Sequence, residues 1–171
     1  MSVIEQSFLE IAPGFRSSEA GLLMASLGDQ PKLGMNTIGM LLAHLALVEV
    51  FWTQVGPERK TQFETDSILG LDLSHGDGMP APADAKPPAH LAGKTLPDYL
   101  DLLAKARAYA NRAVMKLDDD ALNSVFQRTR RYDGKTEELN MRWVLYHMLE
   151  HFSGHYGQIL LLRHQYRDRD R

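Results

Sequence analysis

Residues 37–54 read TIGMLLAHLALVEVFWTQ, and they determine the fold class that we expect. Apolar side chains would lie nearly all round a helix made by this stretch, which is typical of a helix buried among other helices. Asn36 or Thr37 can cap its start, and Gly56-Pro57 can end it. The stretch therefore predicts a core helix over residues 37–54.

Two further long helices follow from the spacing of apolar residues. Over residues 96–117 these recur at intervals of three and four, and Thr95 with Asp98 forms a capping box at the start. Residues 140–165 predict a last long helix that buries much of its circumference, Trp143 included.

The rest of the chain is less regular. Residues 2–12 and 17–27 predict shorter helices, while residues 56–95 are rich in Gly and Pro, so at least their second half is expected to be a surface loop. No stretch shows a convincing strand pattern. We therefore expect an all-α fold: a single domain over residues 1–171, built as a four-helix bundle with a long crossover connection between the second and third main helices.

Composition narrows the classes of function. The chain has 171 residues, 44% of them hydrophobic and 24% charged, and a net charge of -3 that gives no reason to expect nucleic acid or an anionic membrane as partner. Basic clusters around Arg128 and Arg167 stand beside acidic residues and are expected to be solvated. The start lacks a signal-peptide pattern, and no apolar stretch reaches the roughly 18 residues of a membrane span, so a cytoplasmic location is expected.

Three histidines stand four residues apart in HMLEHFSGHYGQI, residues 147–159. Residues four apart on a helix point the same way, so either His147 with His151 or His151 with His155 could bind one divalent ion. His147 and His155 lie about 12 Å apart along the axis, which is too far for all three to share an ion easily. The spacing alone does not choose the pair.

A third ligand would have to come from another helix, and His44 is the obvious candidate because its neighbours are apolar. Three imidazoles with an open position resemble a catalytic site for Zn²⁺, Ni²⁺, Fe²⁺ or Co²⁺. The alternative is a set of core histidines that hydrogen-bond to each other and to carbonyl groups. His75 and His90 fall in the Gly/Pro-rich segment and are expected to be exposed.

One zinc-peptidase motif competes for the same residues. His147-Met-Leu-Glu150-His151 matches H-x-x-E-H, in which the glutamate acts as general base. The third ligand of those enzymes lies well downstream, whereas only 20 residues follow His151 here. This interpretation is therefore the weaker one.

The pattern HLxxxE from His44, combined with HxxxHxGQ from His151, resembles the DinB-like superfamily. That superfamily contains damage-inducible DinB-type proteins, YfiT-like proteins regarded as metal-dependent hydrolases, and bacterial thiol-dependent S-transferases. The resemblance implies a four-helix bundle and the metal ligands His44, His151 and His155. It places His147 and Gln158 beside the ligands or facing a substrate. The chain departs from the family in the short, Pro/Gly-interrupted segment that precedes Thr37.

The resemblance also implies a function. We expect a metal-dependent enzyme acting on a small molecule, either as an S-transferase that binds a thiol such as bacillithiol or mycothiol as thiolate, or as a hydrolase that activates water. The alternatives are a non-catalytic metal-binding or stress-response protein and a purely structural bundle. Dimers are common in the family, so a homodimer is expected.

Overall fold

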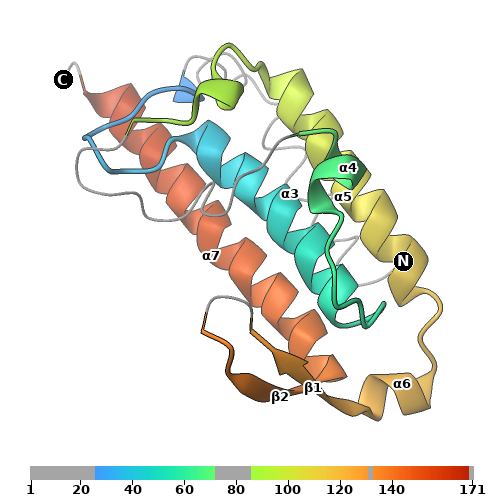
Figure 1. Cartoon of the computed structure of the whole chain (residues 1–171). Coiled ribbons are helices and arrows are strands. Elements are labelled where there is room, and N and C mark those ends of the chain that lie inside the picture. Colours follow the sequence, from blue (N-terminus) through green and yellow to red (C-terminus); the bar gives the residue numbers. More distant parts are fainter. Residues whose placement is uncertain (1–25, 72–85, 131–132, 170–171) are drawn as a thin grey trace. The chain divides into compact units, whose positions relative to one another are not determined.

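A computed structural model describes residues 26–71, 86–130 and 133–169. These residues form five α-helices, one 3₁₀ helix and two strands (Figure 1). In chain order the elements are α3 (Ile38–Val55), α4 (Thr65–Leu69), the 3₁₀ helix (Ala89–Leu91), α5 (Leu96–Val114), α6 (Asp119–Asn123), β1 (Val125–Thr129), β2 (Thr136–Asn140) and α7 (Met141–Asp168).

The three long helices are confirmed, and their first residues explain where they begin. The Thr37 hydroxyl accepts a hydrogen bond from the Met40 N–H at 3.1 Å, so Thr37 caps α3. The Asp98 carboxylate accepts from the Thr95 N–H at 2.6 Å and from the Thr95 hydroxyl at 2.7 Å, which is half of the predicted capping box. The Asn140 side chain accepts from the Arg142 N–H at 2.9 Å and starts α7.

The prediction of an all-α four-helix bundle is wrong. Strands β1 and β2 pair as an antiparallel two-stranded sheet, in which Val125 lies opposite Asn140 and Thr129 opposite Thr136. Beside the long helices, the described residues also contain the short helices α4 and α6. The fold is therefore a helical assembly with a β-hairpin attached before its last helix.

The hairpin has a physical basis that the apolar pattern does not reveal. Its connection contains Asp133 and Gly134, and Gly134 has a φ of +68°, a left-handed conformation that favours glycine. Across the strands, the Arg128 guanidinium lies 3.3 Å from the Glu137 carboxylate. Arg128, predicted to be a solvated charge, is therefore an ion-paired side chain with only 17% of its surface exposed.

Several predictions fall outside the described residues. The expected helices over 2–12 and 17–27 lie there except for residues 26–27, as do His75 and residues 72–85 of the expected loop. His90 lies in the 3₁₀ helix and is exposed, as predicted.

The chain divides into two compact units. The first contains the described parts of Met1–His44, Ser74–Asp101 and Gly154–Arg171, and the second contains those of Leu45–Leu73 and Leu102–Ser153. The boundaries at 44/45, 101/102 and 153/154 cut through helices that are themselves continuous, since α3, α5 and α7 each contribute residues to both units. A single domain over 1–171 stays a prediction.

Helix α3 fills the core. Its 18 residues are long and apolar enough to cross a membrane by length and composition, so the expectation that no stretch reaches that length is wrong. Of this stretch, 83% is buried against the rest of the protein, and core helices of soluble proteins pass the same test. We therefore interpret α3 as a core helix.

In the first unit, a glycine at position 39 allows α3 to pack closely against Tyr99 of α5. The Gly39 N–H donates a hydrogen bond to the Leu27 carbonyl at 2.9 Å, and Tyr99 is 3% exposed. A Cβ added at Gly39 would lie 2.8 Å from the Tyr99 ring carbon Cζ and 3.1 Å from the Leu27 carbonyl oxygen. Only glycine therefore allows this approach.

We expect Gly39→Ala to lower the free energy of unfolding by about 2 kcal/mol, because the methyl group overpacks a closed contact. Chemical denaturation with far-UV circular dichroism measures the change. Gly28→Ala is the control, since a Cβ there meets nothing within 4 Å. Equal stability of the two variants would contradict this account of the contact.

In the second unit, a buried ion pair joins α3 to α5. The Arg107 guanidinium Nε lies 2.5 Å from Glu49 Oε1, and the two side chains are 15% and 8% exposed. Burial raises the pKa of Glu49 from 4.5 to about 7, because removal of water from the carboxylate outweighs the attraction of Arg107. The folded protein thus holds a proton on Glu49 that the unfolded chain releases at lower pH.

This difference predicts a pH dependence of stability. A group whose pKa is raised on folding stabilises the fold below its unfolded pKa, and that stabilisation is lost as the pH rises through the folded pKa. We therefore expect the free energy of unfolding to fall between pH 4.5 and about 7 by up to roughly 3 kcal/mol through Glu49. Denaturation curves across this range should show that Glu49→Gln lacks this part of the slope.

The control is Glu138→Gln, which removes an exposed carboxylate of β2 and should keep the wild-type slope. A Glu49→Gln variant with the wild-type slope would show that Arg107 keeps Glu49 ionised throughout the range.

Candidate metal centre

Two histidines from different helices meet in the first unit. His44 of α3 is 4% exposed, and its ring centroid lies 4.9 Å from that of His155 of α7, with the rings nearly perpendicular at 88°. A buried imidazole needs a polar partner, because its nitrogens lose their contact with water. Through this contact, the face of α7 that carries His155 lies against His44 of α3.

His151 belongs to the same group through the geometry of α7 itself. It precedes His155 by four residues on a continuous helix, so the two imidazoles lie one turn apart on one face. One ring nitrogen from each of His44, His151 and His155 lies within 4.8 Å of the others, and the group could hold a metal ion. The structure thus brings together the three predicted ligands, and their binding of a metal stays a prediction.

The donor set suits a divalent transition metal. Three neutral imidazoles are common ligands of Zn²⁺, Ni²⁺ and Fe²⁺, and three protein ligands leave a coordination position for a small molecule. Nitrogens bound to one tetrahedral ion at about 2.0–2.1 Å lie about 3.3 Å apart. Small side-chain rotations would therefore bring these three nitrogens to binding distance.

Gln158 orients one of the three rings. His155 Nδ1 lies 2.7 Å from Gln158 Oε1, three residues further along α7. Because an amide oxygen only accepts hydrogen bonds, Nδ1 carries the hydrogen and Nε2 keeps its lone pair. Neighbours that fix the tautomer in this way also hold the ring in position for a metal. This contact explains why Gln158 stands near the predicted ligands.

His147 lies apart from the group, in an aromatic environment of the second unit. Its ring stacks on that of Trp143, with centroids 4.9 Å apart and an interplanar angle of 7°, and meets Trp52 edge-on at 5.1 Å. Its centroid lies 5.8 Å from that of His151. His147 Nδ1 also lies 3.6 Å from a Glu150 carboxylate oxygen.

This arrangement bears on the H-x-x-E-H interpretation. The group that could hold a metal among the described residues pairs His151 with His44 and His155 rather than with His147. The tryptophans beside His147 were missed as site residues, and Trp143 was wrongly predicted to be buried: 43% of it is exposed. Its position four residues before His147 was the signal for the stacking.

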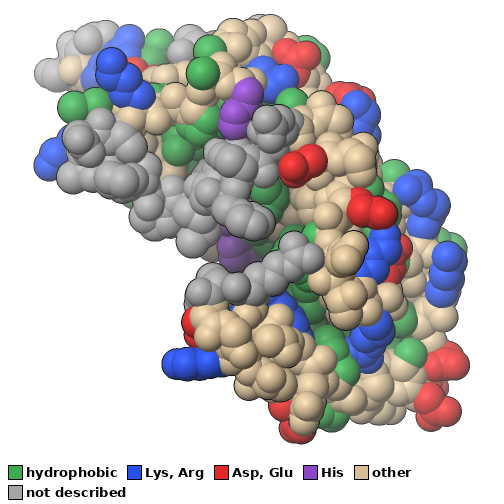
Figure 2. Space-filling view, in the orientation of Figure 1, with side chains coloured by type: hydrophobic (Ala, Val, Ile, Leu, Met, Phe, Trp, Pro, Cys, Tyr) green, Lys and Arg blue, Asp and Glu red, His purple; other side chains and the backbone are tan. Residues whose placement is uncertain are grey.

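The surface around these helices carries mixed charge. On the face drawn in Figure 2, basic and acidic side chains are interspersed, and histidines reach the surface beside hydrophobic side chains. No single-sign patch dominates this face, which agrees with the net charge of -3.

Long helices that bring three histidines together are what the resemblance to the DinB-like superfamily implies. A comparison with protein families matches residues 20–168 to Mycothiol-S-transferase, which covers most of the chain. The chain therefore belongs to the mycothiol S-transferase family. No curated protein and no solved structure matches it. The predicted resemblance to the DinB-like superfamily and its thiol S-transferase relatives is thus confirmed.

The hydrogen bond to Gln158 predicts the tautomer of His155. In metal-free protein at a pH where the ring is neutral, we expect the hydrogen on Nδ1, and we expect Gln158→Leu to return the ring toward the Nε2–H form that free imidazoles prefer. Long-range ¹H–¹⁵N correlation spectra distinguish the two forms. Gln165→Leu changes an amide on the same helix and should leave the spectrum of His155 unchanged. A wild-type Nε2–H form would contradict the assignment.

Proposed function

We propose that this protein is a metal-dependent thiol S-transferase that uses mycothiol. His44, His151 and His155 hold one divalent ion, and a small molecule with an electrophilic carbon is the second substrate. The observation that carries the proposal is the clustering of the three imidazole nitrogens within 4.8 Å, in a chain that belongs to a family named for mycothiol transfer.

The chemistry of the reaction explains why a metal is useful. In the overall reaction the thiol sulfur forms a bond to carbon, the leaving group departs with its electron pair, and the thiol proton is released. A bound divalent ion supplies a site at which a thiol is held as the nucleophilic thiolate. The chain has no cysteine, so the sulfur nucleophile must come from a small thiol.

The residues of the chain divide the remaining work. His44 provides a ligand from the core, where burial excludes water. His151 and His155 provide two more from α7, and Gln158 keeps the His155 ring in the tautomer whose Nε2 can bind. Helices hold ligands more rigidly than loops do, which favours a preformed site.

The aromatic residues beside His151 supply the substrate-facing surface in this proposal. Trp143 is partly exposed and stacks on His147, which contacts the ring of His151. In this proposal the rings of His147 and the two tryptophans form an aromatic wall against which a substrate can rest. Rigid aromatic side chains suit this role because they lose little conformational freedom on binding.

The same proposal includes the features that the sequence predicts for the protein as a whole. These are a cytoplasmic location, a homodimer, and Zn²⁺, Ni²⁺ or Fe²⁺ as the ion. Imidazole ligands suit all three ions, and availability in the cell contributes to the choice.

The test begins with metal content. Tag-free protein should contain about one transition-metal ion per chain by elemental analysis, and His44→Ala and His151→Ala/His155→Ala should lose it while keeping their far-UV helicity. Gln158→Leu should weaken metal affinity by about 10- to 100-fold, as loss of an orienting partner usually does. His90→Ala, which removes an exposed histidine outside the group, should bind metal as the wild type does.

The second step tests the thiol. Co²⁺-loaded protein should show a sulfur-to-metal charge-transfer band when mycothiol is added, and the band should be absent from the His44→Ala variant. Consumption of mycothiol with a panel of electrophiles then measures turnover. Metal binding without a thiol band would favour a hydrolase or a non-catalytic metal-binding protein, and a wild type that cannot be loaded with metal would contradict the proposal.

A further inference from the structure

A cavity of about 680 Å³ lies in the second unit, where the turn after α3 meets the hairpin. Small-molecule pockets typically have about 300–1,000 Å³. The described lining residues include four cationic side chains and no carboxylate: Arg59, Lys60, Arg128 and Arg130. Phe63 and Phe126 supply its apolar walls. None of the three clustered histidines lines this cavity.

Three of the four cations are neutralised by carboxylates outside the lining. These ion pairs are Lys60–Glu64 at 3.0 Å, Arg128–Glu137 at 3.3 Å and Arg130–Asp133 at 2.7 Å. They leave the cavity close to neutral apart from Arg59. Among the described residues, the cavity therefore offers a ligand a single positive charge, that of Arg59.

Arg59 is held without a carboxylate partner among the described residues. Its Nη2 donates a hydrogen bond to the Ser124 hydroxyl at 2.6 Å, and its guanidinium carbon lies 3.4 Å from the centroid of the Phe126 ring. Partial burial lowers the pKa of Arg59, because water is removed from the cation without an anion in its place. Such a guanidinium, with donors to spare, is suited to a carboxylate ligand.

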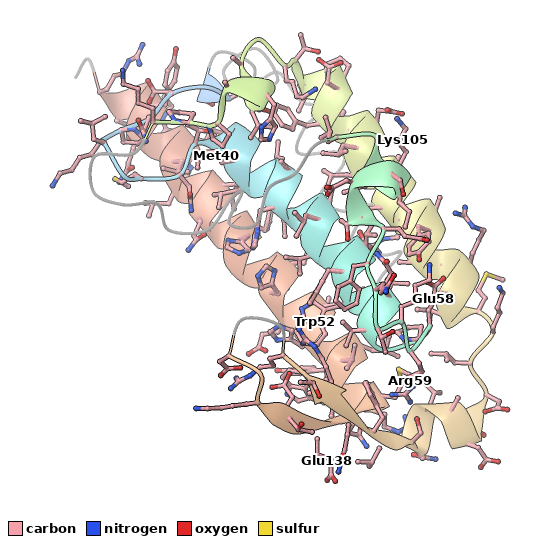
Figure 3. The ribbon with its side chains drawn as sticks, in the orientation of Figure 1. Met40, Trp52, Glu58, Arg59, Lys105 and Glu138 are labelled. Atoms are coloured by element: carbon pink, nitrogen blue, oxygen red, sulfur yellow. The ribbon has the colours of Figure 1, made fainter. Side chains whose placement is uncertain are left out.

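The backbone of Arg59 has a strained conformation. The φ angle of Arg59 is 55°, which lies in the left-handed region. Among the described residues, Arg59 alone of the non-glycine residues has a positive φ. Arg59 occupies the turn that ends α3 (Figure 3). In this turn the Lys60 N–H donates a hydrogen bond to the Gln54 carbonyl at 2.8 Å. Helices usually place glycine at such a turn. An arginine kept in a strained conformation and directed to a cavity indicates a function for its side chain.

We propose that this cavity binds a small organic anion with one carboxylate and a planar apolar body. The carboxylate lies on Arg59, and the apolar body packs against Phe63 and Phe126. A single negative charge fits because three of the four cations are already paired, which disfavours a phosphate dianion. The proposal stands apart from the proposed metal chemistry, since its residues and its test involve no metal.

The test uses isothermal titration calorimetry of the full chain with 2-naphthoate as the probe. We expect one saturable site, affinity at least about tenfold weaker for the neutral analogue 2-naphthamide, and no competition by inorganic phosphate. Arg59→Gln should weaken naphthoate binding by about tenfold or more. Lys135→Gln removes a cation from the same hairpin that does not line the cavity, and should bind as the wild type does.

Arg59→Gly is the second variant, because glycine adopts the observed backbone conformation without strain and keeps the turn intact. It should lose naphthoate binding as Arg59→Gln does. Protein treated with a chelator should bind naphthoate with unchanged affinity, which separates this site from the histidine group. Equal affinity for naphthoate and naphthamide, tight competition by phosphate, or full binding by both Arg59 variants would each overturn the proposal.

Discussion

Burial of the His44 imidazole constrains how α3 and α7 pack against each other in the first unit. Its ring lies in an otherwise apolar segment of α3, where a polar group without a partner is costly. The ring meets His155 of α7, and His155 in turn hydrogen-bonds Gln158. His44, His155 and Gln158 thus contact one another in sequence, from the core to an exposed side chain. These contacts fix which face of α7 lies against α3.

The two polar residues of the family pattern HLxxxE, His44 and Glu49, contact different helices. Glu49 stands five residues further along α3, which turns it about 140° round the helix axis at about 100° per residue. Its carboxylate meets Arg107 of α5, whereas His44 meets α7. The pattern HLxxxE therefore combines one residue of the candidate metal group with one that joins α3 to α5. A sequence pattern does not separate these roles, because separation along the chain does not show which helix packs on which face.

The sequence correctly predicted the features that depend on residue spacing within a single helix. Apolar spacing predicted all three long helices, and the spacing of four residues correctly placed His151 and His155 on one face of α7. The hairpin was missed because only Phe126 and Leu139 supply partly or fully buried apolar positions to its two strands. Its ion pair between Arg128 and Glu137 exists only across the strands. The exposed ring of Trp143 was missed for a related reason, since stacking on His147 stabilises it without full burial.

A series of ring contacts connects the hairpin with His147 and His151. The Arg128 guanidinium carbon lies 5.0 Å from the centroid of the Phe51 ring and 5.2 Å from that of Trp52, at cation–π distance. Trp52 meets His147 edge-on, and His147 contacts His151. Ring packing, more than hydrogen bonding, therefore positions His147. A change in the hairpin at Arg128 can therefore alter the surroundings of His151 without touching any of the three clustered imidazoles. This gives the fold a way to vary the aromatic surface around His147 while the candidate metal ligands stay in place.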